Sequence, residues 1–149
     1  MANKKTLSLV STEEEQGIGR ALLIWLNTYP DKPVDRINFE FFQKDSGGMM
    51  LSTIQAAFKT KQYIFGGYEA QYQFALVYRT KAGGNDDRLS ANEALNAIGA
   101  WAEQNHENLD LGNAVVRSVR RTSNASLLAV YEDGSRDHQI LMNLTYEVN

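Results

Sequence analysis

The sequence predicts an α+β fold: a mostly antiparallel sheet, two main helices packed on one side of it, and a long β-hairpin. Three observations lead to this fold class. Apolar residues recur at helical spacing in two separated segments, around Ile18–Tyr29 and Leu95–Ala102. Segments that alternate apolar and polar residues lie between and after them. Short turns, such as the one at Gly66-Gly67, join consecutive strands and favour antiparallel neighbours.

The first helix is expected to begin near Ser11. A capping box is formed by Ser11 with Glu14, or by Thr12 with Glu15, and the adjacent glutamates suit the positive end of the helix dipole. The apolar positions of this helix are Ile18, Leu22, Trp25, Leu26 and Tyr29. Prolines at positions 30 and 33 then close the element.

Two extended segments are expected next. Val34–Phe42 alternates apolar with polar residues and predicts a strand with one buried face, to which Ile37, Phe39 and Phe41 contribute. Gln43–Gly48 is a polar loop that contains glycine, and Met49–Ala57 is a further extended segment.

The hairpin Lys61–Arg79 turns at Gly66-Gly67, because glycine adopts the positive φ angles that a tight turn requires. At about 3.3 Å per residue, the strand Tyr68–Thr80 spans roughly 40 Å. A compact domain of this length has a radius of gyration of roughly 15 Å. The strand is therefore expected to cross the whole domain or to project from it.

The two ends of this strand differ on its second face. Gln71 and Gln73 make that face polar near the turn, whereas Ala75 and Val77 make it apolar further along. We therefore expect the far end to be buried on both faces. The end near the turn is expected to be open to a partner.

The second half of the chain begins with a flexible linker, Lys81–Asp87, and a helix capped by Ser90 and Glu93. Its apolar side carries Leu95, Ile98, Trp101 and Ala102. Three strands follow, the first from Asn113 onward, then Ser126–Tyr131 and His138–Val148.

Composition limits the class of protein. The 149 residues suit a single domain, 1–149, and the net charge of −3 gives no overall attraction to nucleic acid. The chain has no cysteine, which excludes disulfides and thiolate chemistry. Its longest apolar run, Ala21–Leu26, is too short for a membrane span, and we expect no signal peptide and no membrane association.

No catalytic, cofactor-binding or metal-binding residue is predicted. Neither His106 nor His138 has the spacing to carboxylates or to other histidines that metal and catalytic motifs show, and His138 is expected on the surface. Gly17-Ile18-Gly19 superficially resembles part of a dinucleotide-binding motif. It lies within a predicted helix with no strand before it, which favours close packing instead.

Arginines gather at one strand end of this otherwise acidic chain: Arg117, Arg120 and Arg121. One interpretation is a solvated strand end. The other is a contact with carboxylates of a partner subunit or with a phosphate backbone.

Five stretches together carry a resemblance to a known family: LLIWLNTYP, INFEFF, KQYIFGGYEAQYQFALVYR, LSANEALNAIGAWAEQN and SNASLLAVYEDGSRDHQILMNLTYEV. The chain resembles the tail terminator, or minor capsid, proteins of long-tailed bacteriophages and of prophages of Gram-positive bacteria. The resemblance extends from Ser11 to Val148. It depends on the general run of the sequence and includes no catalytic signature.

This resemblance implies a structural virion protein, and not an enzyme. Such a protein forms a ring, in the better-studied members a hexamer, that caps the tail tube at its head-proximal end. The ring stops tube polymerisation and provides the docking surface for the head. The implied partners are other copies of the chain, the tail tube protein and the head connector or completion protein, while DNA only passes through the channel. The implied location is the virion, after assembly in the cytoplasm of the host bacterium.

The residues expected at subunit interfaces are Gly66, Gly67, Gln71, Gln73, Arg117, Arg120 and Arg121. Two alternatives stay open. The protein could be another head–tail joining or minor capsid component, which composition does not distinguish. It could also be a ligand-binding or enzymatic α+β domain, which would need a convergent polar cluster in an apolar pocket.

Overall fold

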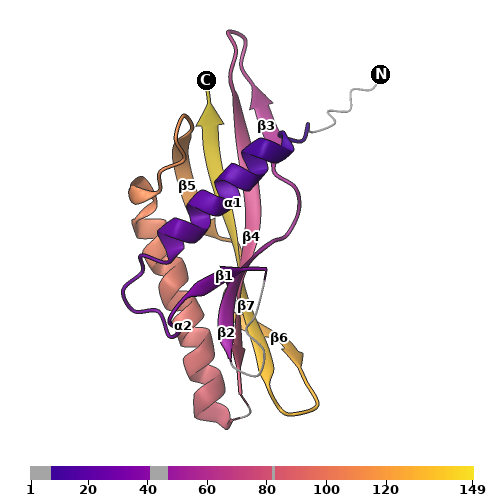
Figure 1. Ribbon diagram of the computed structural model, residues 1–149, viewed down its shortest axis with the longest axis vertical. Helices are drawn as coiled ribbons and strands as arrows, with labels where there is room; N and C mark the ends of the chain where they lie inside the picture. The colour runs from indigo at the N-terminus through magenta and orange to yellow at the C-terminus, as the bar shows by residue number, and fades with distance from the viewer. Residues whose placement is uncertain (1–7, 41–46, 82) are drawn as a thin grey trace.

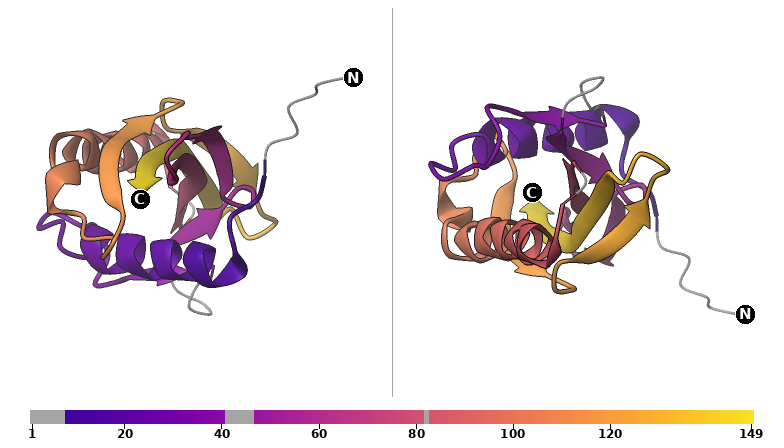
Figure 2. Two further views of the ribbon diagram at one scale, coloured as in Figure 1. Left: turned by 90° about the horizontal axis from the view of Figure 1, so that it is seen from above. Right: turned by 90° about the horizontal axis from the view of Figure 1, so that it is seen from below.

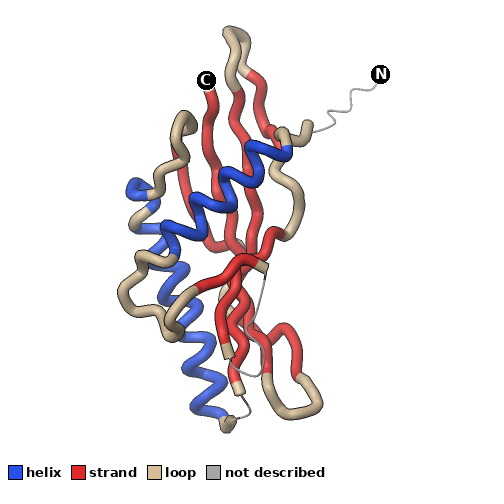
Figure 3. The backbone as a smooth tube through the Cα atoms, in the orientation of Figure 1, coloured by secondary structure: helices blue, strands red, loops and turns tan. Residues whose placement is uncertain are grey.

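The computed structural model describes residues 8–40, 47–81 and 83–149 (Figure 1). Within these residues, two α-helices, one 3-10 turn and seven strands make an elongated α+β molecule, the fold class that the sequence predicts (Figures 1 and 3). The elements are α1 (Thr12–Leu26), β1 (Ile37–Phe39), β2 (Gly48–Thr53), β3 (Phe58–Gln62), β4 (Tyr68–Thr80), α2 (Asn85–Gln104), η1 (His106–Asn108), β5 (Val115–Arg121), β6 (Ser126–Val130) and β7 (Arg136–Val148).

The sheet is built around β4 and β7, which pair antiparallel along their full lengths, from Tyr68 opposite Val148 to Thr80 opposite Arg136. Short strands flank this pair: β2 and β3 share the outer edge of β4, and β5 and β6 share the outer edge of β7. All these pairs are antiparallel, so the predicted antiparallel majority is confirmed. β1 pairs parallel with β2, which the sequence does not predict.

The core lies on one face of the central pair. Even-numbered β4 side chains face β7 partners there, for example Tyr72 opposite Leu144 and Phe74 opposite Met142, and these four residues are fully or almost fully buried. The period-2 pattern of β4 therefore identifies its buried face correctly. Views along the long axis show a strongly curved sheet with α1 along one side (Figure 2).

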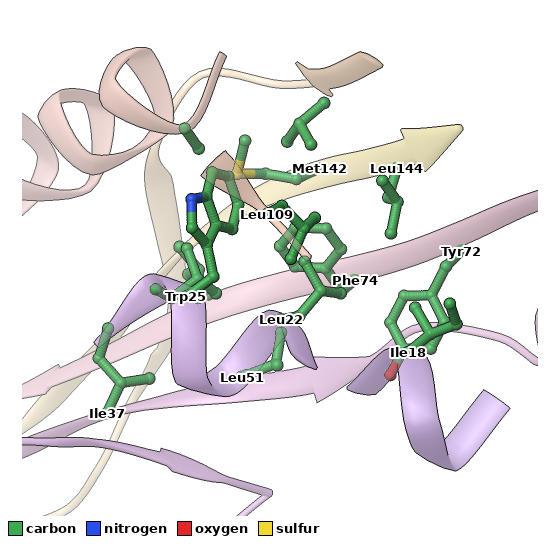
Figure 4. Close-up of a cluster of buried hydrophobic side chains, with 14 of the residues drawn as sticks. Ile18, Leu22, Trp25, Ile37, Leu51, Tyr72, Phe74, Leu109, Met142 and Leu144 are labelled. Atoms are coloured by element: carbon green, nitrogen blue, oxygen red, sulfur yellow. The ribbon is translucent and has the colours of Figure 1, made fainter. Parts of the chain in front are cut away.

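Helix α1 begins at the predicted cap: the Glu14 amide donates to the Ser11 hydroxyl oxygen at 3.1 Å. Its buried residues are Ile18, Gly19, Leu22, Trp25 and Leu26, and several of them pack among β4 and β7 side chains (Figure 4). A Cβ atom added at Gly19 would lie 3.1 Å from the Tyr72 hydroxyl and 3.4 Å from the Phe39 ring. Close packing is thus the role of this glycine, as expected.

Helix α2 begins five residues before the predicted cap at Ser90. Its N-cap is Gly84, whose amide donates to the Asp87 carboxylate at 3.1 Å, and Asp86 and Asp87 occupy its first turn. The predicted linker Lys81–Asp87 is therefore helical at its end, because acidic residues are stabilised at a helix N-terminus. The capping box predicted at Ser90 and Glu93 is wrong.

The strand predicted at Val34–Phe42 is shorter than expected. β1 ends at Phe39, and Glu40 follows with a φ angle of +49°, outside the range of an extended strand. Phe39 is 42% exposed although the alternation predicts it buried. Phe41, which is predicted on the buried face of this strand, lies outside the described residues. The same holds for the predicted loop Gln43–Gly48 up to position 46.

Candidate interaction surface

The turn between β3 and β4 projects beyond the neighbouring strands at one end of the molecule (Figure 1). It comprises Tyr63–Gly67, which we call the hairpin tip. Gly66 and Gly67 have φ angles of +95° and +81°, values that side-chain-bearing residues rarely adopt. A Cβ atom at Gly67 would lie 2.6 Å from the Val148 carbonyl oxygen, whereas a Cβ at Gly66 would meet nothing within 4 Å.

Hydrogen bonds hold the hairpin tip in one conformation. The Tyr63 amide donates to the Gly67 carbonyl at 3.1 Å, and the Gly66 amide donates to the Tyr63 carbonyl at 3.3 Å. The Gln62 side chain donates to the same Gly67 carbonyl at 2.8 Å, and the Tyr63 hydroxyl reaches Glu147 on β7 at 2.8 Å. Hydrogen bonds within the turn and to its neighbours on β3 and β7 therefore hold the backbone of the tip in place.

The tip exposes two large apolar side chains: Ile64 is 92% exposed and Phe65 is 100% exposed. The sequence interpretation missed this, because it places the turn at Gly66-Gly67 and assigns Ile64 and Phe65 to a strand. β3 instead runs from Phe58 to Gln62, so these two residues belong to a five-residue turn. The sequence signal that could have indicated these exposed side chains is the apolar run immediately before the two glycines.

The glutamines expected at an interface lie on the sheet face opposite the core. Gln71 pairs with Thr145 and Gln73 with Asn143, so all four side chains share this face, and all four are partly exposed. Within the described part of the chain the Asn143 side-chain oxygen is buried without a hydrogen-bond partner. Further along β4, Ala75 and Val77 are almost fully buried, as the sequence predicts.

A β-bulge between Val116 and Ser118 divides the three arginines between the two sheet faces. Arg117 forms a salt bridge with Glu147, which lies on the glutamine-bearing face. Arg120 is paired with Asn143 in the sheet register, so it lies on that face too, and it is exposed.

Arg121 points to the other face, where its guanidinium and amide both bond to Glu103 of α2, the guanidinium at 2.8 Å. The expected group of three arginines is thus not a single patch. Simple alternation already places the adjacent Arg120 and Arg121 on opposite faces, but it would put Arg121 on the face of Arg117. The bulge adds one residue to β5 and reverses every residue after it, so Arg120 shares that face instead.

The structure therefore brings together four of the seven expected interface residues on one surface, which we call the polar face: Gln71, Gln73, Arg117 and Arg120, with Glu69, Asn143, Thr145 and Glu147. Hydrogen bonds from Arg117 and Tyr63 lower the pKa of Glu147. The negative charge of Glu147 is thereby stabilised where the polar face meets the hairpin tip. Gly66 and Gly67 border this face, and Arg121 does not.

The opposite end of the β4–β7 pair carries a charge network centred on a buried carboxylate, Asp137. Arg79 donates to Asp137 with two nitrogens, at 2.7 and 2.9 Å, and the Tyr131 hydroxyl donates to the same carboxylate at 2.6 Å. Asp137 is only 3% exposed, and through these hydrogen bonds it joins β7 to β4 and to Tyr131, the residue after β6. We interpret the network as structural.

His138 is buried, with 1% of its surface exposed, so the expectation of a surface histidine is wrong. Its Nδ1 lies 2.9 Å from the Asn92 side-chain oxygen on α2, and its Nε2 has no hydrogen-bond partner among the described residues. Burial lowers the pKa of His138, and Arg136 lowers it further. The residue faces the helix because it has the same parity as Ile140 and Met142 in β7.

In the described part of the chain, no group of three or more histidine or acidic side chains is arranged to hold a metal ion. No helix among those residues is long and apolar enough to cross a membrane. Comparison with known proteins finds no family model that matches this chain and no similar sequence among curated proteins.

Proposed function

We propose that this protein is a structural component of a bacteriophage or prophage virion that caps the tail tube as a ring. In this role it stops polymerisation of the tube and provides the surface on which the head docks. The sequence resemblance to tail terminator proteins supports this proposal. The α+β fold with an antiparallel-majority sheet agrees with the fold class that the resemblance implies.

The observation that carries the proposal is the hairpin tip beside the polar face. A rigid turn that exposes Ile64 and Phe65 almost completely is unfavourable for an isolated soluble chain and favourable for one that assembles. The polar face keeps the neighbouring surface hydrated before assembly. This arrangement suits a subunit that stays dispersed until it meets its partners.

The partners in this proposal are other copies of the chain, most simply six in a cyclic ring, together with the tail tube protein and the head connector or completion protein. DNA passes through the central channel. The net charge of −3 suits such a channel, because a basic wall would bind the phosphate backbone and retard passage. The site of action is the head-proximal end of the tail, after assembly in the bacterial cytoplasm.

Deletion of the gene from the phage or prophage tests this function. We expect filled heads together with tails that are either longer than normal or not joined to heads, and supply of the gene in trans restores normal particles. Normal, joined particles from the deletion strain would contradict the proposal. Tails that are longer than normal would show the capping role directly. Tails of normal length that fail to join heads would show the docking role alone, which another head–tail joining component shares.

A three-dimensional reconstruction of the virion tests the ring directly. We expect a closed ring of this chain at the junction of head and tail, since head-to-tail contacts that close generate rings. A single copy, or a dimer with two-fold symmetry, at that junction would exclude the ring.

A further inference from the structure

We propose that the hairpin tip of one copy inserts into an apolar groove beside α1 of a second copy. The partner is thus another molecule of the same chain. The proposal rests on the ring-forming function proposed above and identifies the contact that would build the ring. The groove lies between α1, the segment Asn108–Ala114 and Val148, and it has a volume of about 770 Å³.

The hairpin tip has the properties of a binding anchor. Phe65 and Ile64 extend fully into solvent, while the hydrogen bonds of Tyr63, Gly66 and Gly67 fix the backbone that carries them. A large apolar side chain on a fixed backbone loses little conformational entropy when it is buried in a partner. The tip itself carries no charged residue that would have to be desolvated.

The groove has the matching shape and chemistry. Gly17 and Ala21 line its α1 side with small residues, and a Cβ atom added at Gly17 would meet nothing within 4 Å. Ile24 and Leu111 supply apolar walls, and Ile24 is 66% exposed in the single chain. An aromatic side chain placed there would cover Ile24 and exclude water from both surfaces.

Charged side chains border both surfaces. Lys59 and Lys61 stand on β3 just before the tip, with Glu69 opposite Lys61, and Lys59 lies 4.3 Å from the centre of the Tyr68 ring. The groove is bordered by Arg20, by Asp110 and by Glu14, whose carboxylate accepts hydrogen bonds from Tyr68 and Tyr146. Approach of Lys59 or Lys61 to Asp110 would help to fix the orientation of the two copies.

Tip and groove are different surfaces, and within one chain they do not meet, since Ile64 and Phe65 are almost completely exposed. A contact between them in two copies is therefore heterologous, or head-to-tail. Each subunit then offers one tip and one groove, and repetition of the same contact continues until the assembly closes. This is the symmetry that a ring requires.

Because the chain has no cysteine, single introduced thiols can test the contact without background. One preparation carries Phe65→Cys in the hairpin tip and a second carries Ile24→Cys in the groove, and the two are mixed with a short thiol-specific cross-linker. We expect a cross-linked peptide that joins positions 65 and 24. The matched control replaces Ile24→Cys by Leu128→Cys on β6, where the side chain is 49% exposed and lies outside the groove.

A second measurement uses charge. Phe65→Asp and Ile24→Asp should each weaken self-association by at least about tenfold in sedimentation at high protein concentration, and Leu128→Asp should leave it unchanged. All three positions are exposed, so the melting temperature of each variant checks that the fold is intact. Equal cross-linking of position 65 to positions 24 and 128, or wild-type association in both Asp variants of the contact, would overturn the proposal.

The outcomes separate this contact from the ring itself. A virion ring that tolerates Phe65→Asp and Ile24→Asp would overturn the tip-in-groove contact and leave the proposed function standing. If virions that contain the unaltered protein show no ring, both the tip-in-groove contact and the proposed function are overturned. Binding of the unaltered protein to phospholipid vesicles that is lost with Phe65→Asp but kept with Ile24→Asp would assign the tip to a lipid surface and exclude the groove as its partner.

Discussion

Glu14 connects α1 to the two central strands through one carboxylate. Tyr146, fully buried on β7, donates to one of its oxygens at 2.6 Å, and Tyr68 on β4 donates to the other. Burial, followed by the hydrogen bond to Glu14, raises the pKa of Tyr68 to about 12, so its hydroxyl stays protonated as a donor. Glu14 is therefore a structural residue, as well as part of the helix cap.

Replacement of Glu14 by Ala should lower the free energy of unfolding by about 2 kcal/mol, because the buried Tyr146 hydroxyl loses its acceptor. Urea unfolding measures this change. Glu13→Ala is the matched control, since Glu13 lies in the same helical turn and is exposed, and it should change stability by less than about 0.5 kcal/mol. Similar effects of the two substitutions would show that the loss comes from the helix dipole alone.

The lowered pKa of His138 predicts that the stability of the fold depends on pH. Its pKa is lowered in the folded state, chiefly by burial, so the unfolded chain binds a proton more readily than the folded one. Stability from this residue is therefore fully present above the unfolded pKa of about 6.5 and is lost as the pH falls from there toward the folded pKa. We expect unfolding midpoints in urea to decline from about pH 7.5 to about pH 5.5.

His138→Gln removes this titration. The variant is expected to be less stable overall, but its midpoint should decline less over the same pH interval than that of the unaltered protein. Both proteins retain His106 and all carboxylates, so the difference between their slopes isolates position 138. Parallel slopes would contradict the assignment.

At the scale of elements, the hairpin between β3 and β4 depends on two glycines for different reasons. Both have positive φ angles, but only Gly67 lies against the backbone of Val148. Gly66→Ala should cost about 1 kcal/mol of stability from conformational strain. Gly67→Ala should cost more, since the carbonyl oxygen of Val148 would have to move as well. Thermal unfolding of the two variants shows which substitution lowers the melting temperature more. An equal loss, or a larger loss for Gly66→Ala, would mean that the C-terminal end of β7 shifts freely.

The β5 bulge is the other decisive element. It places Arg120 on the polar face and Arg121 against α2, where Glu103 holds it. Burial raises the pKa of Glu103, but the hydrogen bonds from Arg121 outweigh this and lower it. Of the three arginines, only Arg120 forms no salt bridge within the described residues, so it is the one best placed to contact a neighbouring subunit.

At the scale of the whole molecule, the two ends of the β4–β7 pair have different roles. One end is closed by the Arg79–Asp137 network, and the other carries the hairpin tip beside the polar face. The long central pair thus acts as a rigid support that presents the tip. An interaction surface on a rigid element loses less freedom on assembly than one on a loose loop.

Hydrogen exchange should record this difference during assembly. Among the described residues, no acceptor is found for the amides of Ile64 and Phe65, so they should exchange quickly in the isolated subunit. In the ring they should exchange more slowly, together with amides of the polar face, while amides of the buried β4 segment 74–77 stay slow in both states. Unchanged exchange across residues 63–72 would place the subunit contact elsewhere.

Local sequence patterns were sufficient to predict the fold class, the start of α1 and the buried face of β4. These features depend on local periodicity and capping chemistry, as Ile18, Leu22 and the Ser11 cap illustrate. The difference between the polar Gln71 end and the buried Val77 end of β4 also followed from the residues alone.

Positions that depend on strand register and on partners distant in the chain could be assigned only from the folded structure. The five-residue turn that exposes Phe65 is set by the pairing of Gln62 with Tyr68, and one extra residue in β5 decides that Arg120, and not Arg121, shares the face of Arg117. His138 is buried because α2 covers its face of β7. A shift of one residue reverses the face of every side chain in a strand, and the energy that fixes this register comes from contacts between strands and helices far apart in sequence.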